Sequence, residues 1–121
     1  MILPDTSVWI DHFRGDERTL ATLLRSQDLL LHPFVIGELA LGHVPRRAET
    51  ISRLQRQLQA PIVAPNDVLT FIERQHLAAS GLSYIDVQLL ASLNDMGNAK
   101  LWTFDKRLHA AAHRLGIAAQ F

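Results

Sequence analysis

Residues 1–14, MILPDTSVWIDHFR, place a short apolar run directly before an acid and a helix-forming segment. We predict a strand over residues 1–4 and a helix over residues 6–14, so that Asp5 stands at the carboxyl end of the strand. The rest of the chain repeats this alternation of apolar runs with segments of helical period. Such alternation favours an α/β domain with a parallel sheet.

The other expected elements follow in the same alternating order along the chain. Further strands are predicted at residues 29–32, 61–64, 101–104 and 117–121. Further helices are predicted at residues 18–26, 34–42, 46–59, 66–80, 84–96 and 106–115. Gly97 and Gly116 follow two of these helices, where glycine can adopt the left-handed conformation that ends a helix.

Composition limits the classes of protein to consider. The chain has 121 residues, of which 48% are hydrophobic and 20% are charged, so we expect residues 1–121 to form one compact domain. The formal net charge is zero, so a nucleic acid or membrane surface would have to be bound by a local patch. The absence of cysteine excludes disulfides and thiol catalysis, and it suits a cytoplasmic protein. We see no signal peptide and no membrane-spanning run, and therefore expect no membrane partner.

Three acids fall at predicted element ends. Asp5 and Asp105 each follow a strand directly, and the carboxyl ends of parallel strands are where such sheets bind ligands. Asp86 lies in the first turn of the helix over residues 84–96. Each acid also has a structural explanation, because Asp5 and Asp105 can be helix N-caps and Asp86 can complete a capping box with Ser83.

A fourth acid, Glu38, lies within the apolar run FVIGELAL at residues 34–41. Burying a carboxylate there is costly unless it is paired or bound to a cation, although an exposed position on a half-buried helix is the alternative. Four clustered carboxylates would repel one another, and a set of oxygen ligands suits Mg²⁺ or Mn²⁺. Such an ion can activate water and stabilise a leaving oxygen, as hydrolysis of a phosphodiester requires. The hydroxyls of Ser7 and Thr103, beside two of the acids, can orient a carboxylate or a metal-bound water.

These residues occur in a familiar order. The segments DTSVWID at 5–11, EL at 38–39, DVQLLA at 86–91 and LWTFD at 101–105 resemble the PIN-domain nucleases, most closely the VapC-type toxins of toxin–antitoxin pairs. The resemblance spans essentially the whole chain. It implies a three-layer fold, with a parallel sheet of four to five strands flanked by helices. It also implies one or two Mg²⁺ or Mn²⁺ ions held by Asp5, Glu38, Asp86 and Asp105, with cleavage of RNA, inhibition by a cognate antitoxin, and a homodimer.

Basic residues give weaker signals for RNA binding. Arg46, Arg53 and Arg56 can form a phosphate-binding stripe on the helix over residues 46–59, although a solvated helix face explains them equally well. Arg107 can contact phosphate or form a salt bridge with the acidic cluster.

The leading hypothesis is therefore a metal-dependent endoribonuclease toxin that hydrolyses RNA with a metal-activated water. The first alternative is a non-catalytic PIN-like module that binds a protein or RNA. A second alternative is phosphoryl transfer through an aspartyl-phosphate on Asp5. It is disfavoured because Ser7 stands where a second acid is expected, and because the only lysines are Lys100 and Lys106.

Overall fold

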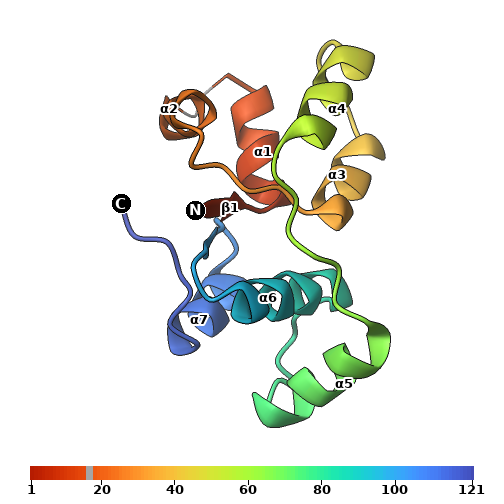
Figure 1. The fold of residues 1–121 in the computed structure, drawn as a ribbon, viewed down its shortest axis with the longest axis vertical. Coiled ribbons are helices and arrows are strands. Elements are labelled where there is room, and N and C mark those ends of the chain that lie inside the picture. The colour runs from red at the N-terminus through yellow and green to blue at the C-terminus, as the bar shows by residue number, and fades with distance from the viewer. Residues whose placement is uncertain (16–17) are drawn as a thin grey trace.

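A computed structural model describes residues 1–15 and 18–121, and it confirms an α/β arrangement (Figure 1). The two strands pair in parallel, and helices lie between them along the chain and after the second strand. The elements in chain order are β1 (Ile2–Pro4), α1 (Thr6–Phe13), α2 (Arg18–Ser26), α3 (Pro33–Ala40), α4 (Arg47–Arg56), α5 (Pro65–Arg74), α6 (Tyr84–Met96), β2 (Lys100–Trp102) and α7 (Lys106–Arg114).

The sheet is built around the pair β1 and β2, with Leu3 opposite Leu101. Single parallel bridges extend it on both sides, and they join Ile2 to Leu29, Leu31 to Gln59, and Leu101 to Ala118. Five chain segments therefore lie side by side, in the order Gln59, Leu29–Leu31, β1, β2 and Ala118. All their pairings are parallel, as the sequence predicted.

The predicted strand at residues 61–64 is wrong, because the bridging residue is Gln59. Val63 instead pairs with the side chain of Gln88 on α6. Its N–H donates to Gln88 Oε1 at 2.6 Å, and its carbonyl accepts from Gln88 Nε2 at 3.0 Å. The amide side chain thus takes the place that a neighbouring strand would occupy.

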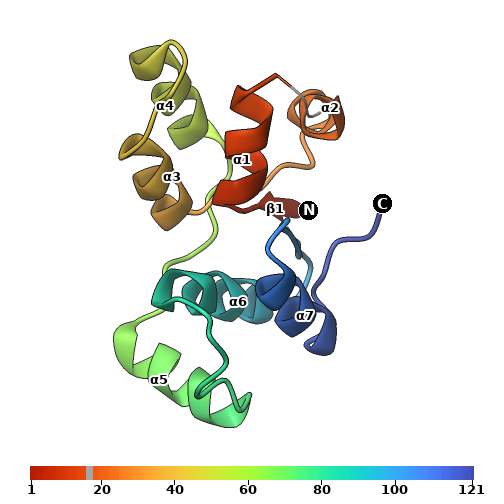
Figure 2. The ribbon, with the colours of Figure 1, turned by 180° about the vertical axis from the view of Figure 1, so that it is seen from behind.

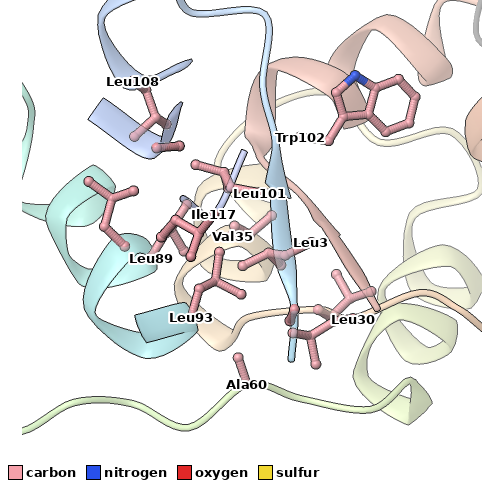
Figure 3. Close-up of a cluster of buried hydrophobic side chains, with 14 of the residues drawn as sticks. Leu3, Leu30, Val35, Ala60, Leu89, Leu93, Leu101, Trp102, Leu108 and Ile117 are labelled. Carbon is pink, nitrogen blue, oxygen red and sulfur yellow. The ribbon is translucent and has the colours of Figure 1, made fainter. Parts of the chain in front are cut away.

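Helices cover both faces of the sheet. The two views in Figures 1 and 2 place α1 to α4 on one side of β1, and α5, α6 and α7 on the other. Figure 3 shows the core between these layers, where Leu3 and Leu101 from the strands meet Val35 of α3, Leu89 of α6 and Leu108 of α7. These side chains are essentially inaccessible to water, so their burial supplies the main driving force that holds the layers together. No helix in the described part of the chain has both the length and the apolar character needed to cross a bilayer.

A second buried cluster in the structure is polar and consists of His32, Gln88 and Ser92; we call it the His32 cluster. The amide of Phe34 donates to His32 Nδ1 at 3.0 Å, which caps α3 and leaves the ring proton on Nε2. His32 Nε2 lies 3.0 Å from the hydroxyl oxygen of Ser92, and that hydroxyl donates to the carbonyl of Pro61 at 2.7 Å. Burial lowers the pKa of His32 to about 4, so the ring is neutral at pH 7.

Several helix ends fall within one residue of the prediction, but α3, α4 and α5 end two, three and six residues before the predicted residue. Helix α6 has the predicted bounds, with a capping box from Ser83 at its start and Gly97 in the left-handed conformation at its end. Helix α5 ends at Arg74, whereas the sequence predicted a helix to residue 80. The chain leaves α5 because His76 adopts a φ of +54°, in the left-handed region.

Candidate active site

Asp5 occupies the corner between β1 and α1, and its side chain is only 6% exposed. Its Oδ1 accepts a hydrogen bond from the Ser7 hydroxyl at 2.5 Å and from the Val8 amide at 3.3 Å. Its Oδ2 accepts from the Thr103 hydroxyl, which lies 98 residues further along the chain. Both carboxylate oxygens are therefore held in fixed directions.

Burial is the largest influence on the charge of Asp5, and it raises the pKa of this carboxyl above 3.8. The hydrogen bonds from Ser7, Thr103 and Val8 lower the pKa, because they stabilise the ionised form. The negative charge of Asp86 raises it again. The charge of Asp86 thus adds to the effect of burial on Asp5.

Asp86 also has the structural role that the sequence offered as an alternative, because it completes the capping box at the start of α6. Ser83 Oγ accepts from the Asp86 amide at 3.1 Å, and Asp86 Oδ2 accepts from the Ser83 amide at 3.3 Å, which completes a capping box. The carboxylate is half-buried. One oxygen serves the helix cap, and the capping box leaves the other oxygen unused.

Asp105 caps α7, and its carboxylate is exposed. Its Oδ1 accepts from the Leu108 amide at 2.9 Å, and its own amide donates to Thr103 Oγ1 at 3.0 Å. Thr103 thereby joins the backbone at Asp105 to the carboxylate of Asp5. Ser7 makes a second link of the same kind, because its hydroxyl also accepts from the Phe104 amide at 3.1 Å.

Glu38 corrects one expectation from the sequence, because it is exposed rather than buried. Helix α3 buries Val35, Ile36 and Leu39, which leaves Gly37 and Glu38 on its outer face. Glu38 lines a cavity of about 420 Å³, together with Ile10 of α1 and other residues of α1 and of the segment after α3.

The side chains around Asp5 fit a cation in donor chemistry but do not form a complete ligand cluster. Across residues 1–15 and 18–121, no group of three or more acidic, histidine or cysteine side chains is close enough to hold a metal. The ion pairs in the same residues join the N-terminus to Asp28 and Arg53 to Glu49, so none neutralises Asp5, Glu38, Asp86 or Asp105. A set of carboxylates without a basic partner is the donor set that a divalent cation prefers.

The basic residues singled out from the sequence lie in two places. Arg46 and Arg56 are exposed at the two ends of α4, and Arg53 is engaged with Glu49 at 3.5 Å. Arg107 lies at the start of α7, and its guanidinium rests against the backbone of Gly81. Two residues near Arg107 were missed by sequence reasoning, namely His76 and Arg114. They are distant from one another in the sequence and belong to no motif.

Comparisons with known proteins agree on one family. The family model for the PIN domain matches residues 2–114 of this chain. Ribonuclease VapC32 of Mycobacterium tuberculosis, in strains CDC 1551 and H37Rv, is 43% identical over 118 residues, which span 98% of this chain and 95% of the relative.

A solved structure has the same fold. The crystal structure of PAE2754 from Pyrobaculum aerophilum superposes with a TM-score of 0.64, covering 98% of this chain and 87% of that chain. Its sequence identity is 16%, so this likeness concerns the fold alone.

Proposed function

Because this chain belongs to the PIN-domain family, we propose that it is a metal-dependent endoribonuclease of the VapC type, the toxin of a toxin–antitoxin pair. Family membership rests on the match over residues 2–114 and on the 43% identity to Ribonuclease VapC32. We further propose that residues 1–121 act as a single nuclease domain in the cytoplasm.

The observation that carries this proposal is the state of Asp5. Its carboxylate is buried, it is fixed through both oxygens, and it is repelled by Asp86. Two neutral hydroxyls and an amide do not offset a buried negative charge with a second one nearby. A divalent cation would offset it, and it would lower the pKa of Asp5 toward the ionised form.

In this proposal Asp5, Asp86, Asp105 and Glu38 hold Mg²⁺ or Mn²⁺. When bound, such an ion lowers the pKa of water and stabilises the leaving oxygen during hydrolysis of a phosphodiester. Ser7 and Thr103 keep Asp5 in one orientation, because each hydroxyl donates to a different oxygen of the carboxylate. Asp105 and Glu38 are both exposed, so in this proposal an RNA strand could reach them.

The proposed partners follow from the same class of protein. A cognate antitoxin would lay a segment over the toxin and bring a basic side chain to the acidic site. The cavity beside Glu38, with Ile10 and Leu39 in its wall, offers that segment an apolar surface. We also propose that the toxin is a homodimer, which light scattering after size-exclusion chromatography would test.

Cleavage of single-stranded RNA with Mg²⁺, with Mn²⁺ and with excess EDTA tests the proposed activity. We expect cleavage with either ion, none in EDTA, and recovery when the metal is restored. For the variant Asp5→Asn, Asp95→Asn is a matched control that should cleave like wild type. Asp95 is an exposed acid near the end of α6 and lies outside the proposed site. Cleavage that persists in EDTA would contradict metal dependence. An absence of any cleavage, together with no Mn²⁺-dependent rise in Tm, would favour the non-catalytic binding module.

A further inference from the structure

A basic cleft lies beside the acidic site, between α7 and the loop that joins α5 to α6. Its volume is about 400 Å³ and its polar walls are His76, Ser80, Arg107 and Arg114. All four residues are exposed, and no acid is among the described residues that line the cleft. A neutral protein needs such a local concentration of positive charge to bind an anionic polymer.

The cleft shares its loop with the acidic site. On one side of the loop, the Ser83 amide donates to Asp86. On the other side, a Cβ at position 81 would lie 2.5 Å from Arg107 Nη1 and 3.2 Å from Arg107 Cζ, so the guanidinium would have to shift if residue 81 carried a side chain. Gly81 also has a φ of +82°, which favours glycine for a second reason. Arg107 is therefore held close to the chain that positions Asp86.

Arg114 forms the far wall of the cleft and is anchored differently. Its Nη2 donates to the carbonyl of Gln75, at the end of α5, at 2.7 Å. A guanidinium has five N–H donors, so this bond leaves several free to contact an anion. In residues 1–15 and 18–121, neither Arg107 nor Arg114 forms an ion pair with an acid.

His76 occupies a backbone position where a histidine brings no conformational advantage. The Leu77 amide donates to the Ile72 carbonyl at 3.0 Å, and the His76 amide donates to the Glu73 carbonyl at 3.3 Å, which is the pattern of a Schellman helix end. The residue at this point adopts the left-handed conformation, and glycine is the residue that does so without strain. His76 thus lines the basic cleft from a backbone position that glycine would suit better.

We propose that Arg107, Arg114 and His76 bind backbone phosphates of the RNA strand next to the bond that is cleaved. This inference rests on the proposed ribonuclease function and assigns the surface that holds the substrate. Arginine presents a planar fork that suits phosphate oxygens, and the shared loop places the cleft alongside the carboxylates. A strand bound there would enter the acidic site without any sequence-specific contact.

The test measures RNA binding separately from cleavage. A short fluorescein-labelled single-stranded RNA is titrated with the full chain in EDTA, and Kd is followed by anisotropy over a range of salt concentrations. Arg107→Ala should weaken binding about tenfold. It should also reduce the slope of log Kd against log salt by about 0.7, the value expected when one fewer phosphate of a single strand is neutralised. Arg25→Ala on α2, at an exposed position outside every proposed site, is the control and should change neither quantity.

Two glycine variants make the test independent of folding. His76→Gly should keep or raise Tm, because glycine suits the backbone there, and yet weaken RNA binding. Ala79→Gly is matched to it, since Ala79 also has a left-handed φ of +58°, and it should leave RNA binding unchanged. Arg107→Lys should fall between wild type and Arg107→Ala, because it keeps the charge and removes the fork.

The outcomes separate this inference from the proposed function. Suppose that wild type cleaves RNA with metal, while Arg107→Ala and His76→Gly keep the Kd and salt slope of wild type. This result would contradict RNA binding by the basic cleft and would leave the proposed nuclease function standing. An equal loss of RNA binding in Arg25→Ala would also contradict the proposal, since any exposed arginine would then contribute as much. Loss of antitoxin binding with intact RNA binding would assign the cleft to the partner instead. If wild type binds RNA through the cleft but never cleaves it, only the proposed nuclease function would be contradicted.

Discussion

The His32 cluster and the surroundings of Asp5 are both buried and polar, but they differ in how charge is balanced. In the His32 cluster a neutral ring, a hydroxyl and an amide are hydrogen-bonded to one another or to the backbone at Pro61 and Val63. Asp5 has hydrogen bonds to both oxygens, but burial and, to a smaller extent, the charge of Asp86 still oppose its ionisation. A satisfied neutral network holds a fold together, whereas a fixed carboxylate with a like charge nearby is poised to bind a cation.

The largest expected effect comes from removing the charge at Asp5. Asp5→Asn keeps a good helix cap but should lower RNA cleavage by about a thousandfold, since the interactions of a catalytic metal are worth several kcal/mol. The same variant should be at least as stable as wild type without metal, because the raised pKa shows that ionised Asp5 is unfavourable in the folded state. Single-turnover cleavage and urea unfolding in EDTA measure the two effects. A variant that is inactive because it is unfolded would show the opposite change in stability.

The second effect is a dependence of stability on pH that originates in His32. Its pKa is about 4 in the folded protein and 6.5 unfolded, so the unfolded state binds more protons between these values. Stability should therefore fall as pH decreases from about 6.5 to 4, by about 3 kcal/mol in total. Urea unfolding at several pH values measures it.

His32→Asn isolates this contribution, since asparagine can cap α3 but does not titrate. It should be less stable than wild type at pH 7 and show a flatter loss of stability toward pH 4. His109→Ala, at an exposed position on α7, is the control and should leave the slope unchanged. The raised pKa of Asp5 acts in the opposite direction, because stability from that group increases as pH falls toward 3.8. If stability changes with pH equally in His32→Asn and wild type, then His32 does not cause the pH dependence.

The smallest expected effect comes from removing the Thr103 hydroxyl, which distinguishes Asp5 from the His32 cluster by its support of a charged group. Thr103→Val removes the donor to Asp5 Oδ2 and the acceptor for the Asp105 amide, while it keeps the shape of the side chain. Cleavage should fall roughly tenfold, as is usual when a group that orients a metal ligand is removed. Thr103→Ser should restore most of the rate, because it retains the hydroxyl. Equal rates for wild type and Thr103→Val would show that Asp5 needs no such support.

The elements that local signals control could be predicted from the sequence. Helix α6 was predicted with its bounds because Ser83, Asp86 and Gly97 act within one turn of its ends. The positions of Ser7 and Thr103 beside acids at strand ends likewise indicated that these hydroxyls could orient a carboxylate. The PIN family and the parallel sheet followed from the order of such motifs.

The errors arise where distant residues decide the structure. The apolar run at residues 61–64 has the composition of a strand, but Gln88 supplies its hydrogen bonds. The left-handed conformation of His76 ends α5 early without a glycine to signal it. The exposure of Glu38 depends on which face of α3 packs against its neighbours. Because apolar residues flank Glu38 on both sides in the sequence, the sequence pattern does not show which face is buried. The roles of the four acids as metal ligands stay a prediction.

The two hydroxyl links at Ser7 and Thr103 have a consequence for biosynthesis. They tie the first turn after β1 to residues about one hundred positions later, at the end of β2. During translation the ribosome must therefore release the chain beyond Asp105 before these contacts can form, and Asp5 Oδ2 lacks its hydrogen-bond donor until then. The proposed active site is therefore completed only when most of the sequence has been synthesised.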